Sequence, residues 1–296
     1  MALNIATFKT RAATAGIFVV VMLAGMLWNS WSFFILFSVI HFGCWIEYQK
    51  LVCVINPEYT DISPFHKYGV MIAGWCVVLY FTNDAFTIFG VALHTIGMWL
   101  GLIAIFALPV AEFLFSSQFE LKNMGWSAFG LLYISLSLGM MMDIRCMGMI
   151  EKYTGDYTDA FGVFLPLGIL IALWINDTMA YLVGSFIGKT PFSKISPKKT
   201  WEGTIGGAIL CLLVVALLGK WIGVYTIKTW IFIAIIVAIF GVAGDLFESK
   251  LKRMAGVKDS GSIMPGHGGF LDRFDSLLFA TPFVWLYLHF FLEQIV

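Results

Sequence analysis

The sequence predicts an all-α, polytopic integral membrane protein. Its 296 residues are 60% hydrophobic and only 12% charged, and a mean hydropathy of +0.88 is far above that of a soluble domain. Apolar stretches long enough to cross a bilayer recur along the chain. The formal net charge of zero gives no overall field that would favour nucleic acid, so we expect no nucleic-acid partner.

By the length that a membrane span requires, we expect about nine transmembrane helices. The first follows Lys9 and Arg11 and looks like a signal peptide, but no small-residue cleavage pattern follows it, so we expect a retained helix. The fourth is long enough to be tilted or to contain a break near Pro109. The nine stretches lie near residues 12–28, 31–53, 68–82, 86–115, 124–145, 161–187, 203–222, 229–249 and 271–293.

The distribution of Lys and Arg predicts the orientation of these helices. If the amino end is cytoplasmic, 14 of the 18 Lys and Arg residues fall in cytoplasmic segments or at cytoplasmic helix ends. The remaining four are Arg145, Lys152, Lys220 and Lys228. A bias of this size follows the positive-inside rule. We therefore expect the amino end and the loops 188–202 and 250–270 to face the cytoplasm.

The chain divides by its chemistry into transmembrane scaffold helices (1–145) and a catalytic membrane region (146–296). In the scaffold, Glu47 and Glu112 lie near helix ends, where we expect their side chains to reach water rather than to bind a ligand. The segment 146–160 is expected to be a solvated external connector. The five cysteines form no CxxC pair, so neither a disulfide framework nor a zinc site is indicated.

The sixth apolar stretch contains an ionisable residue. Asp177 lies within the run LWINDTMAYLVGSFIGK, where an ionised group is costly and often functional. A carboxylate satisfied by a neighbouring helix is the alternative; we favour a side chain that lines a polar cavity. Ala180, Gly184 and Gly188 follow at intervals of four residues, and this strip predicts close packing against another helix.

The loop after this stretch combines hydroxyl groups with amines in the segment SPKKTWEG (196–203). Ser196, Lys198 and Lys199 are suited to hold phosphate groups. The segment is no Walker A motif, because no GxxxxGK[ST] loop follows a strand. From these residues alone, a basic loop that contacts anionic lipid headgroups is the alternative.

Residues 244–275 hold five basic residues and five carboxylates in a chain with few charges. Asp245 and Glu248 lie three residues apart and share one helical face. Asp272 and Asp275 repeat this spacing at the start of the last helix, although Asp275 has an alternative role beside the helix dipole. If the two faces meet, they form an oxygen-rich site for a hard divalent cation.

The same stretch carries basic residues and a glycine-rich loop. Lys252, Arg253, Lys258 and Arg273 are candidates to neutralise phosphates, although basic residues at the end of the eighth helix are also typical headgroup anchors. His267 lies in the loop PGHGG, where substrate contact and hydrogen bonding within the loop are equally open.

Four short motifs follow one another in this region: SKLKR (249–253), KD (258–259), PGHGG (265–269) and DRFD (272–275). Their order and spacing closely resemble the signature of phosphatidate cytidylyltransferases, also called CDP-diacylglycerol synthases. Met264 stands where Leu, Ile or Phe is usual, which is a conservative departure. The loop SPKKTWEG is similar to a second element of that family. The resemblance covers the chain well from Asp177 onward.

This resemblance implies transfer of the cytidylyl group from CTP to phosphatidate, with release of pyrophosphate, at the cytoplasmic face of a bacterial inner membrane. It also implies a homodimer. We further expect a requirement for Mg²⁺, with Mn²⁺ as a substitute and a second cation such as K⁺. The expected metal ligands are Asp245, Asp272 and Glu248. The expected catalytic residues are Asp245, Asp272, Lys252, Arg253, His267 and Arg273, and the expected substrate-binding residues are Asp177, Ser196, Lys198, Lys199, Lys258 and Asp275.

Two alternatives remain at this point. A related membrane transferase that acts on another lipid phosphate or nucleotide would use the same residue types, because no element of the sequence is identified as reading the cytosine base. A secondary transporter of organic anions would predict broken helices in two related halves. The candidate site charges are concentrated after residue 176, and no counterpart is evident in the first half.

Overall fold

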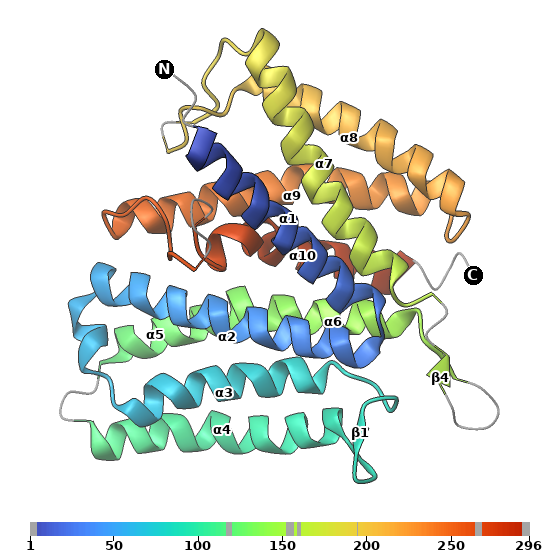
Figure 1. The fold of residues 1–296 in the computed structure, drawn as a ribbon. Helices are drawn as coiled ribbons and strands as arrows, with labels where there is room; N and C mark the ends of the chain where they lie inside the picture. The colour runs from blue at the N-terminus through green and yellow to red at the C-terminus, as the bar shows by residue number, and fades with distance from the viewer. Residues whose placement is uncertain are drawn as a thin grey trace.

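The computed structural model describes residues 5–116, 120–151, 157–158, 161–193, 195–263 and 268–291, and these are almost entirely helical (Figure 1). The helices are α1 (Ile5–Leu27), α2 (Ser30–Ile55), η1 (Pro57–Asp61), α3 (Pro64–Tyr80), α4 (Leu93–Phe115), α5 (Leu121–Gly130), η2 (Leu131–Leu136), α6 (Ser137–Met147), α7 (Phe164–Ile187), α8 (Trp201–Ile222), α9 (Ile227–Met254) and α10 (Leu271–Phe291). Two small antiparallel hairpins pair β1 (Thr87–Ile88) with β2 (Val91–Ala92), and β3 (Ile150–Glu151) with β4 (Tyr157–Thr158).

Each of the nine predicted stretches overlaps a helix of this structure, and the fifth overlaps the continuous rod α5–η2–α6. Within the described residues, seven helices are long and apolar enough to cross a membrane. The helix α3 has 17 residues, and the described apolar part of α1 is the shorter segment Ala13–Leu27. The all-α, polytopic membrane class is therefore confirmed, while the count of nine spans and the cytoplasmic amino end stay predictions.

Two predicted helix boundaries were wrong. The fourth helix begins at Leu93 rather than near residue 86, because the preceding residues form the β1–β2 hairpin around Phe89 and Gly90, which have φ values of 50° and 79°. It then runs through Pro109 without a break. The helix α9 continues to Met254, so Lys250, Lys252 and Arg253, which were expected in the loop 250–270, lie on its last turns instead.

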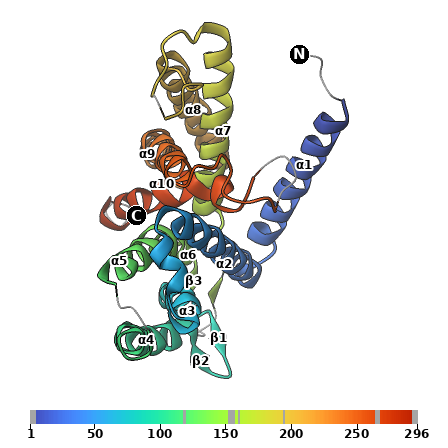
Figure 2. The ribbon, with the colours of Figure 1, turned by 90° about the vertical axis from the view of Figure 1, so that its left-hand side faces the viewer.

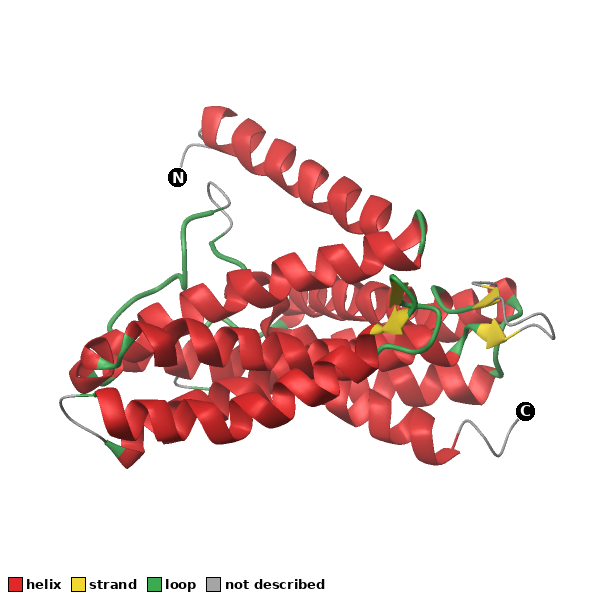
Figure 3. Ribbon diagram, turned by 90° about the horizontal axis from the view of Figure 1, so that it is seen from below, coloured by secondary structure: helices red, strands yellow, loops and turns green. Residues whose placement is uncertain are grey.

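The long helices are stacked side by side, as Figure 1 shows from α4 through α3 and α2 to α10 and α9. The pair α7 and α8 packs against α9 at one end of this stack. Figure 2, which views the stacked helices nearly end-on, and Figure 3, which views them from below, show that α1 leans away from the other helices; it packs chiefly on α2. The helix α10 is central, because it packs on α9 and α7 and also on α2 and α6.

The strip of small residues on α7 packs closely on α8, as predicted. A Cβ atom added to Gly203 would lie 2.8 Å from the carbonyl oxygen of Ala180, and one added to Gly207 would lie 2.5 Å from the backbone nitrogen of Ala180. At the end of the strip, a Cβ atom on Gly188 would lie 2.6 Å from Thr200 Oγ1. These approaches bring the loop between the two helices against the carboxyl end of α7.

A second close approach joins α9 to α10. A Cβ atom on Gly244 would lie 2.6 Å from the carbonyl oxygen of Asp275 and 2.7 Å from Phe279 Cβ. The glycine therefore allows the two backbones to touch beside Asp245. This crossing determines where the carboxylates of the two helices meet.

Candidate active site

A cavity of about 510 Å³ lies between α7, α9, the amino end of α10 and the loop before α8. It brings together eight of the predicted site residues: Asp177, Ser196, Lys198, Lys199, Asp245, Asp272, Arg273 and Asp275. Residues that are 98 positions apart, Asp177 and Asp275, thus line one space. Carboxylates and cations in one cavity of a membrane protein indicate a functional site, because such groups are costly inside a bilayer.

Three carboxylates at the α9–α10 crossing lie close enough to share one ion. Asp245, Glu248 and Asp275 each offer an oxygen atom within 4.8 Å of the others. Glu248 is 0% exposed; its Oε2 contacts Lys252 Nζ, whereas its Oε1 has no hydrogen-bond partner in the part of the chain that is described. A buried carboxylate oxygen without a partner is unfavourable. The cluster therefore fits a divalent cation, which would satisfy it.

Asp272 lines the same cavity, but its two oxygens already have protein partners. Its Oδ1 accepts a hydrogen bond from Lys252 Nζ at 2.6 Å. Its Oδ2 accepts from the backbone nitrogens of Ser260 and Gly269 at 2.8 Å and 2.9 Å. Asp272 thus ties the end of α9 and the preceding loop to α10, and its predicted role as a metal ligand stays a prediction. The structure adds Asp275, predicted as a substrate-binding residue, to the candidate ligands.

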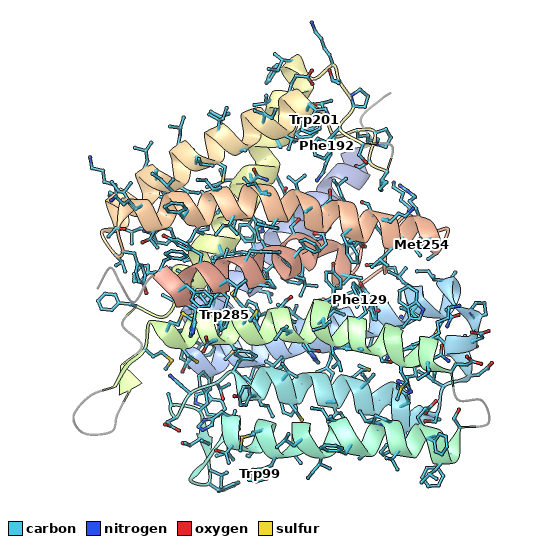
Figure 4. All side chains as sticks on the ribbon, turned by 180° about the vertical axis from the view of Figure 1, so that it is seen from behind. Trp99, Phe129, Phe192, Trp201, Met254 and Trp285 are labelled. Atoms are coloured by element: carbon cyan, nitrogen blue, oxygen red, sulfur yellow. The ribbon has the colours of Figure 1, made fainter. Side chains whose placement is uncertain are left out.

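The basic side of the cavity comes from the loop between α7 and α8. Its ends are joined by a bridge between Pro191 and Thr200, and the Glu202 carboxylate accepts hydrogen bonds from the backbone of Lys189 and Thr190 at 3.1 Å. The rings of Phe192 and Trp201 lie together at the start of α8 (Figure 4), with centroids 4.4 Å apart. These contacts give the loop a defined shape at the mouth of the cavity.

Two lysines of this loop line the cavity. Lys199 Nζ forms an ion pair with Asp245 Oδ2, which joins the basic loop to the carboxylate cluster. Lys198 lines the cavity beside it, as does Ser196. The arrangement combines positive charge with acidic groups, as a site for a nucleotide and its metal ion requires.

Five predicted residues are not among the described residues that line this cavity: Glu248 and Lys252, which pair with each other, and Arg253, Lys258 and His267. Arg253 lies on the last turn of α9 (Figure 4 labels the neighbouring Met254) and its Nη1 donates to the carbonyl oxygen of Val257 at 3.3 Å. Neither Arg253 nor Lys258 is among the described residues that line the space. His267 lies outside the described residues. The roles assigned to Arg253, Lys258 and His267 stay predictions.

Two carboxylates expected to reach water are buried instead. Glu47 is 1% exposed and Glu112 is 4% exposed. The Glu47 carboxylate accepts hydrogen bonds from the loop before α10, and Glu112 Oε2 accepts one from Ser63 Oγ at 2.6 Å. The expectation was wrong because other segments cover these helix ends. Glu47 is more than 200 positions from its partners, so local sequence gave no indication of the contact.

Asn176 is a further polar residue that the sequence analysis missed. It lines the cavity, is buried, and its Oδ1 has no hydrogen-bond partner within the described chain. An amide oxygen in this position is available to a ligand or ion. Its place next to Asp177 in an apolar helix was the signal that could have identified it.

The fold and the cavity define a class: a polytopic membrane protein whose cavity combines clustered carboxylates with Lys and Arg side chains. The chain belongs to the Cytidylyltransferase family, whose sequence model matches residues 9–291. This membership confirms the resemblance found in the sequence and the assignment as a nucleotidyltransferase.

Several curated relatives are named phosphatidate cytidylyltransferase. The phosphatidate cytidylyltransferase of Bacillus subtilis (strain 168) is 34% identical over 197 residues, which is 66% of this chain and 69% of the relative. That of Helicobacter pylori is 41% identical over 131 residues, 41% of this chain and 48% of the relative. That of Staphylococcus aureus (strain COL) is 45% identical over 128 residues, 42% of this chain and 49% of the relative. The last two alignments span about half the length of those relatives.

Proposed function

We propose that this chain transfers the cytidylyl group of CTP to phosphatidate, forming CDP-diacylglycerol and pyrophosphate. The observation that carries the proposal is the single cavity in which the carboxylate cluster of α9 and α10 meets Lys198, Lys199 and Arg273. The names of the relatives support the two substrates. A cavity at the ends of membrane helices lets a lipid phosphate and a soluble nucleotide meet while each remains in its own phase.

In the proposed reaction, an oxygen of the lipid phosphate attacks the α-phosphorus of CTP in line. The new P–O bond forms as the bond between the α-phosphorus and the bridging oxygen breaks, and pyrophosphate leaves with that oxygen. Both reactants are anionic, so neutralisation and alignment are the main tasks of the protein. The ammonium groups of Lys198 and Lys199 and the Arg273 guanidinium serve both. The phosphate nucleophile is already ionised at neutral pH, so no strong general base is needed.

We further propose that Asp245, Glu248 and Asp275 hold Mg²⁺, with Mn²⁺ as a substitute. The buried, partnerless Oε1 of Glu248 supports this assignment, as does the spacing of the three carboxylates. When bound, the ion would neutralise charge on the nucleotide phosphates. Asp272 keeps Lys252 and the loop before α10 in place around this cluster. A second cation such as K⁺ stays part of the proposal.

The proposed location is the cytoplasmic membrane of a bacterium, with the cavity open to the cytoplasm, and the proposed assembly is a homodimer. The bacterial relatives and the bias of Lys and Arg toward one side of the predicted spans support the location. Accessibility of single cysteines introduced in loop 188–202 to a membrane-impermeant reagent would test the orientation. The mass of the detergent-solubilised protein would test the dimer.

The activity is tested with purified protein in mixed micelles that contain phosphatidate. Each of the four nucleoside triphosphates is supplied in turn, and CDP-diacylglycerol and pyrophosphate are measured. We expect both products with CTP and almost none with ATP, GTP or UTP. Turnover only with another nucleotide or another lipid phosphate would assign the chain to a related transferase. Absence of pyrophosphate release with every combination would overturn the enzymatic proposal.

A further inference from the structure

We propose that Glu47, on α2 in the first half of the chain, is a positioning residue of the active site. It holds the amino end of α10 and the loop before it, and so sets the place of Asp272 and Asp275 in the cavity. The inference rests on the proposed function for its kinetic consequence, but its structural content can be measured without activity.

The Glu47 carboxylate receives three hydrogen bonds from two parts of the segment that links α9 to α10. Its Oε1 accepts the backbone N–H of Phe270 at 3.0 Å. Its Oε2 accepts the backbone N–H of Leu271 at 2.9 Å and the hydroxyl of Ser260 at 2.8 Å. The side chain is 1% exposed, so water does not compete for these donors. One carboxylate therefore fastens both described parts of this loop, residues 255–263 and 268–270, to α2.

Two of these donors lie where α10 begins, since Phe270 immediately precedes the first residue of the helix, Leu271. The first N–H groups of a helix have no acceptor within it, and the dipole makes this end favourable for a negative charge. A nearby Ser, Thr, Asp or Asn side chain usually supplies the acceptor. At α10, the Phe270 and Leu271 donors are instead satisfied by a residue 223 and 224 positions away. Glu47 thus fixes the point at which α10 begins.

The loop leaves space for this carboxylate by having glycine at both positions that face it. A Cβ atom on Gly261 would lie 2.2 Å from Glu47 Oε1, and one on Gly269 would lie 2.1 Å from Glu47 Oε2. Any side chain at these positions would displace the carboxylate. The space that holds the Glu47 carboxylate is therefore lined by hydrogen-bond donors and kept open by the two glycines.

A shared hydroxyl connects Glu47 to the site residues. Ser260 Oγ lies 2.8 Å from Glu47 Oε2 and 2.9 Å from Asp272 Oδ2, and Asp272 in turn binds Lys252 at 2.6 Å. Because Asp275 is one helical turn beyond Asp272, a shift in the start of α10 moves both carboxylates. A displacement of about 1 Å at a catalytic site can reduce the rate roughly 100-fold.

A carboxylate that only stabilises the fold would have the same burial, so the test needs a matched control. Glu112 on α4 is also buried and hydrogen-bonded: Ser63 Oγ donates to its Oε2, and His66 Nδ1 lies 3.5 Å from the same oxygen. These partners lie in the first half of the chain, away from the α9–α10 loop. Glu47→Gln and Glu112→Gln therefore make the same chemical change in two buried carboxylates, and only the first touches α10.

The kinetic experiment compares the two variants with the parent protein in the CDP-diacylglycerol assay. For Glu47→Gln we expect kcat to fall by about 10- to 100-fold, as for residues that orient metal ligands, with a higher Mg²⁺ concentration at half-maximal rate and a KM for CTP within roughly 3-fold. Glu112→Gln should keep nearly the parent rate. Parent kcat and Mg²⁺ dependence in Glu47→Gln, or an equal loss in both variants, would overturn the inference.

An activity-independent measurement separates this inference from the proposed function. Hydrogen exchange of the Phe270 and Leu271 amides should be faster in Glu47→Gln than in the parent and unchanged in Glu112→Gln. Equal exchange rates in all three proteins would overturn the inference. This outcome can be read whether or not the protein has cytidylyltransferase activity. If Glu47→Gln does not fold, Gly261→Ala applies the displacement from the loop side and should give the same increase in exchange. A parent protein that is inactive while this exchange pattern holds would overturn only the proposed function.

Discussion

Substitution of Gly244 by alanine should separate catalysis from stability, because this glycine allows α9 and α10 to touch beside the carboxylate cluster. An added Cβ atom would lie 2.7 Å from Phe279 Cβ and 2.6 Å from the Asp275 carbonyl oxygen. Ordinary contact between carbon atoms begins near ~3.5 Å. The helices must therefore move apart by roughly 0.8 Å, as judged from that contact distance, at the position where Asp245 and Asp275 face one another.

The two consequences of Gly244→Ala have different sizes. Overpacking costs about 1–3 kcal/mol, and alanine offsets about 1 kcal/mol of this through its higher helix propensity, so the free energy of unfolding should fall by at most about 2 kcal/mol. Turnover should fall by roughly 10- to 100-fold, because the separation displaces the candidate metal ligands. The assay is CDP-diacylglycerol formation at a series of Mg²⁺ concentrations, with thermal unfolding followed in the same detergent.

Gly125→Ala is the matched control, since a Cβ atom at this exposed position on α5 meets nothing within 4 Å. It should keep the parent activity and gain up to about 1 kcal/mol of stability. Parent turnover and parent Mg²⁺ dependence in Gly244→Ala would show that the α9–α10 crossing does not set the geometry of the site.

Three further predictions follow from the cavity. Asp275→Asn should lower turnover and raise the Mg²⁺ requirement by at least about 10-fold, as measured by metal titration; an unchanged requirement would remove Asp275 from the ligand set. Lys198→Ala should raise the apparent KM for CTP by roughly 10-fold, because the loss of one hydrogen bond to a charged group weakens binding by about this factor. An unchanged KM would instead support the alternative that this loop contacts lipid headgroups. Excess chelator should abolish product formation and added Mg²⁺ should restore it; turnover that resists the chelator would remove the metal proposal.

The class of fold was predictable from the sequence because length and apolar character are local properties. Helix boundaries were less so. The hairpin before α4 depends on the turn at Phe89 and Gly90, and the extension of α9 to Met254 accompanies the contact of Lys252 with Glu248 one turn earlier on the same helix. The hairpin and the helix extension were both missed because the predicted boundaries depended only on the length and hydropathy of each apolar stretch.

The sequence predicted which types of residue form the site, but not how these residues are arranged in space. The spacing correctly placed Asp245 and Glu248 on one face of α9. It could not determine whether Asp272 or Asp275 completes the cluster, because this depends on how α10 is rotated about its axis. That rotation follows from the close approach at Gly244 and the contact with Glu47, and both involve residues remote in sequence. Asn176 lines the same cavity. It was missed because only ionisable residues were considered as candidates within the apolar helix.

The proposed metal site requires that carboxylates of α9 and α10 hold one divalent cation at the crossing beside Gly244. The most direct measurement is anomalous diffraction from crystals of the protein grown with Mn²⁺ and a non-hydrolysable CTP analogue. We expect an anomalous peak within coordination distance of Asp245 and Asp275, and its loss in Asp275→Asn. A Mn²⁺ peak remote from both carboxylates, in protein that is active with Mn²⁺, would contradict the account.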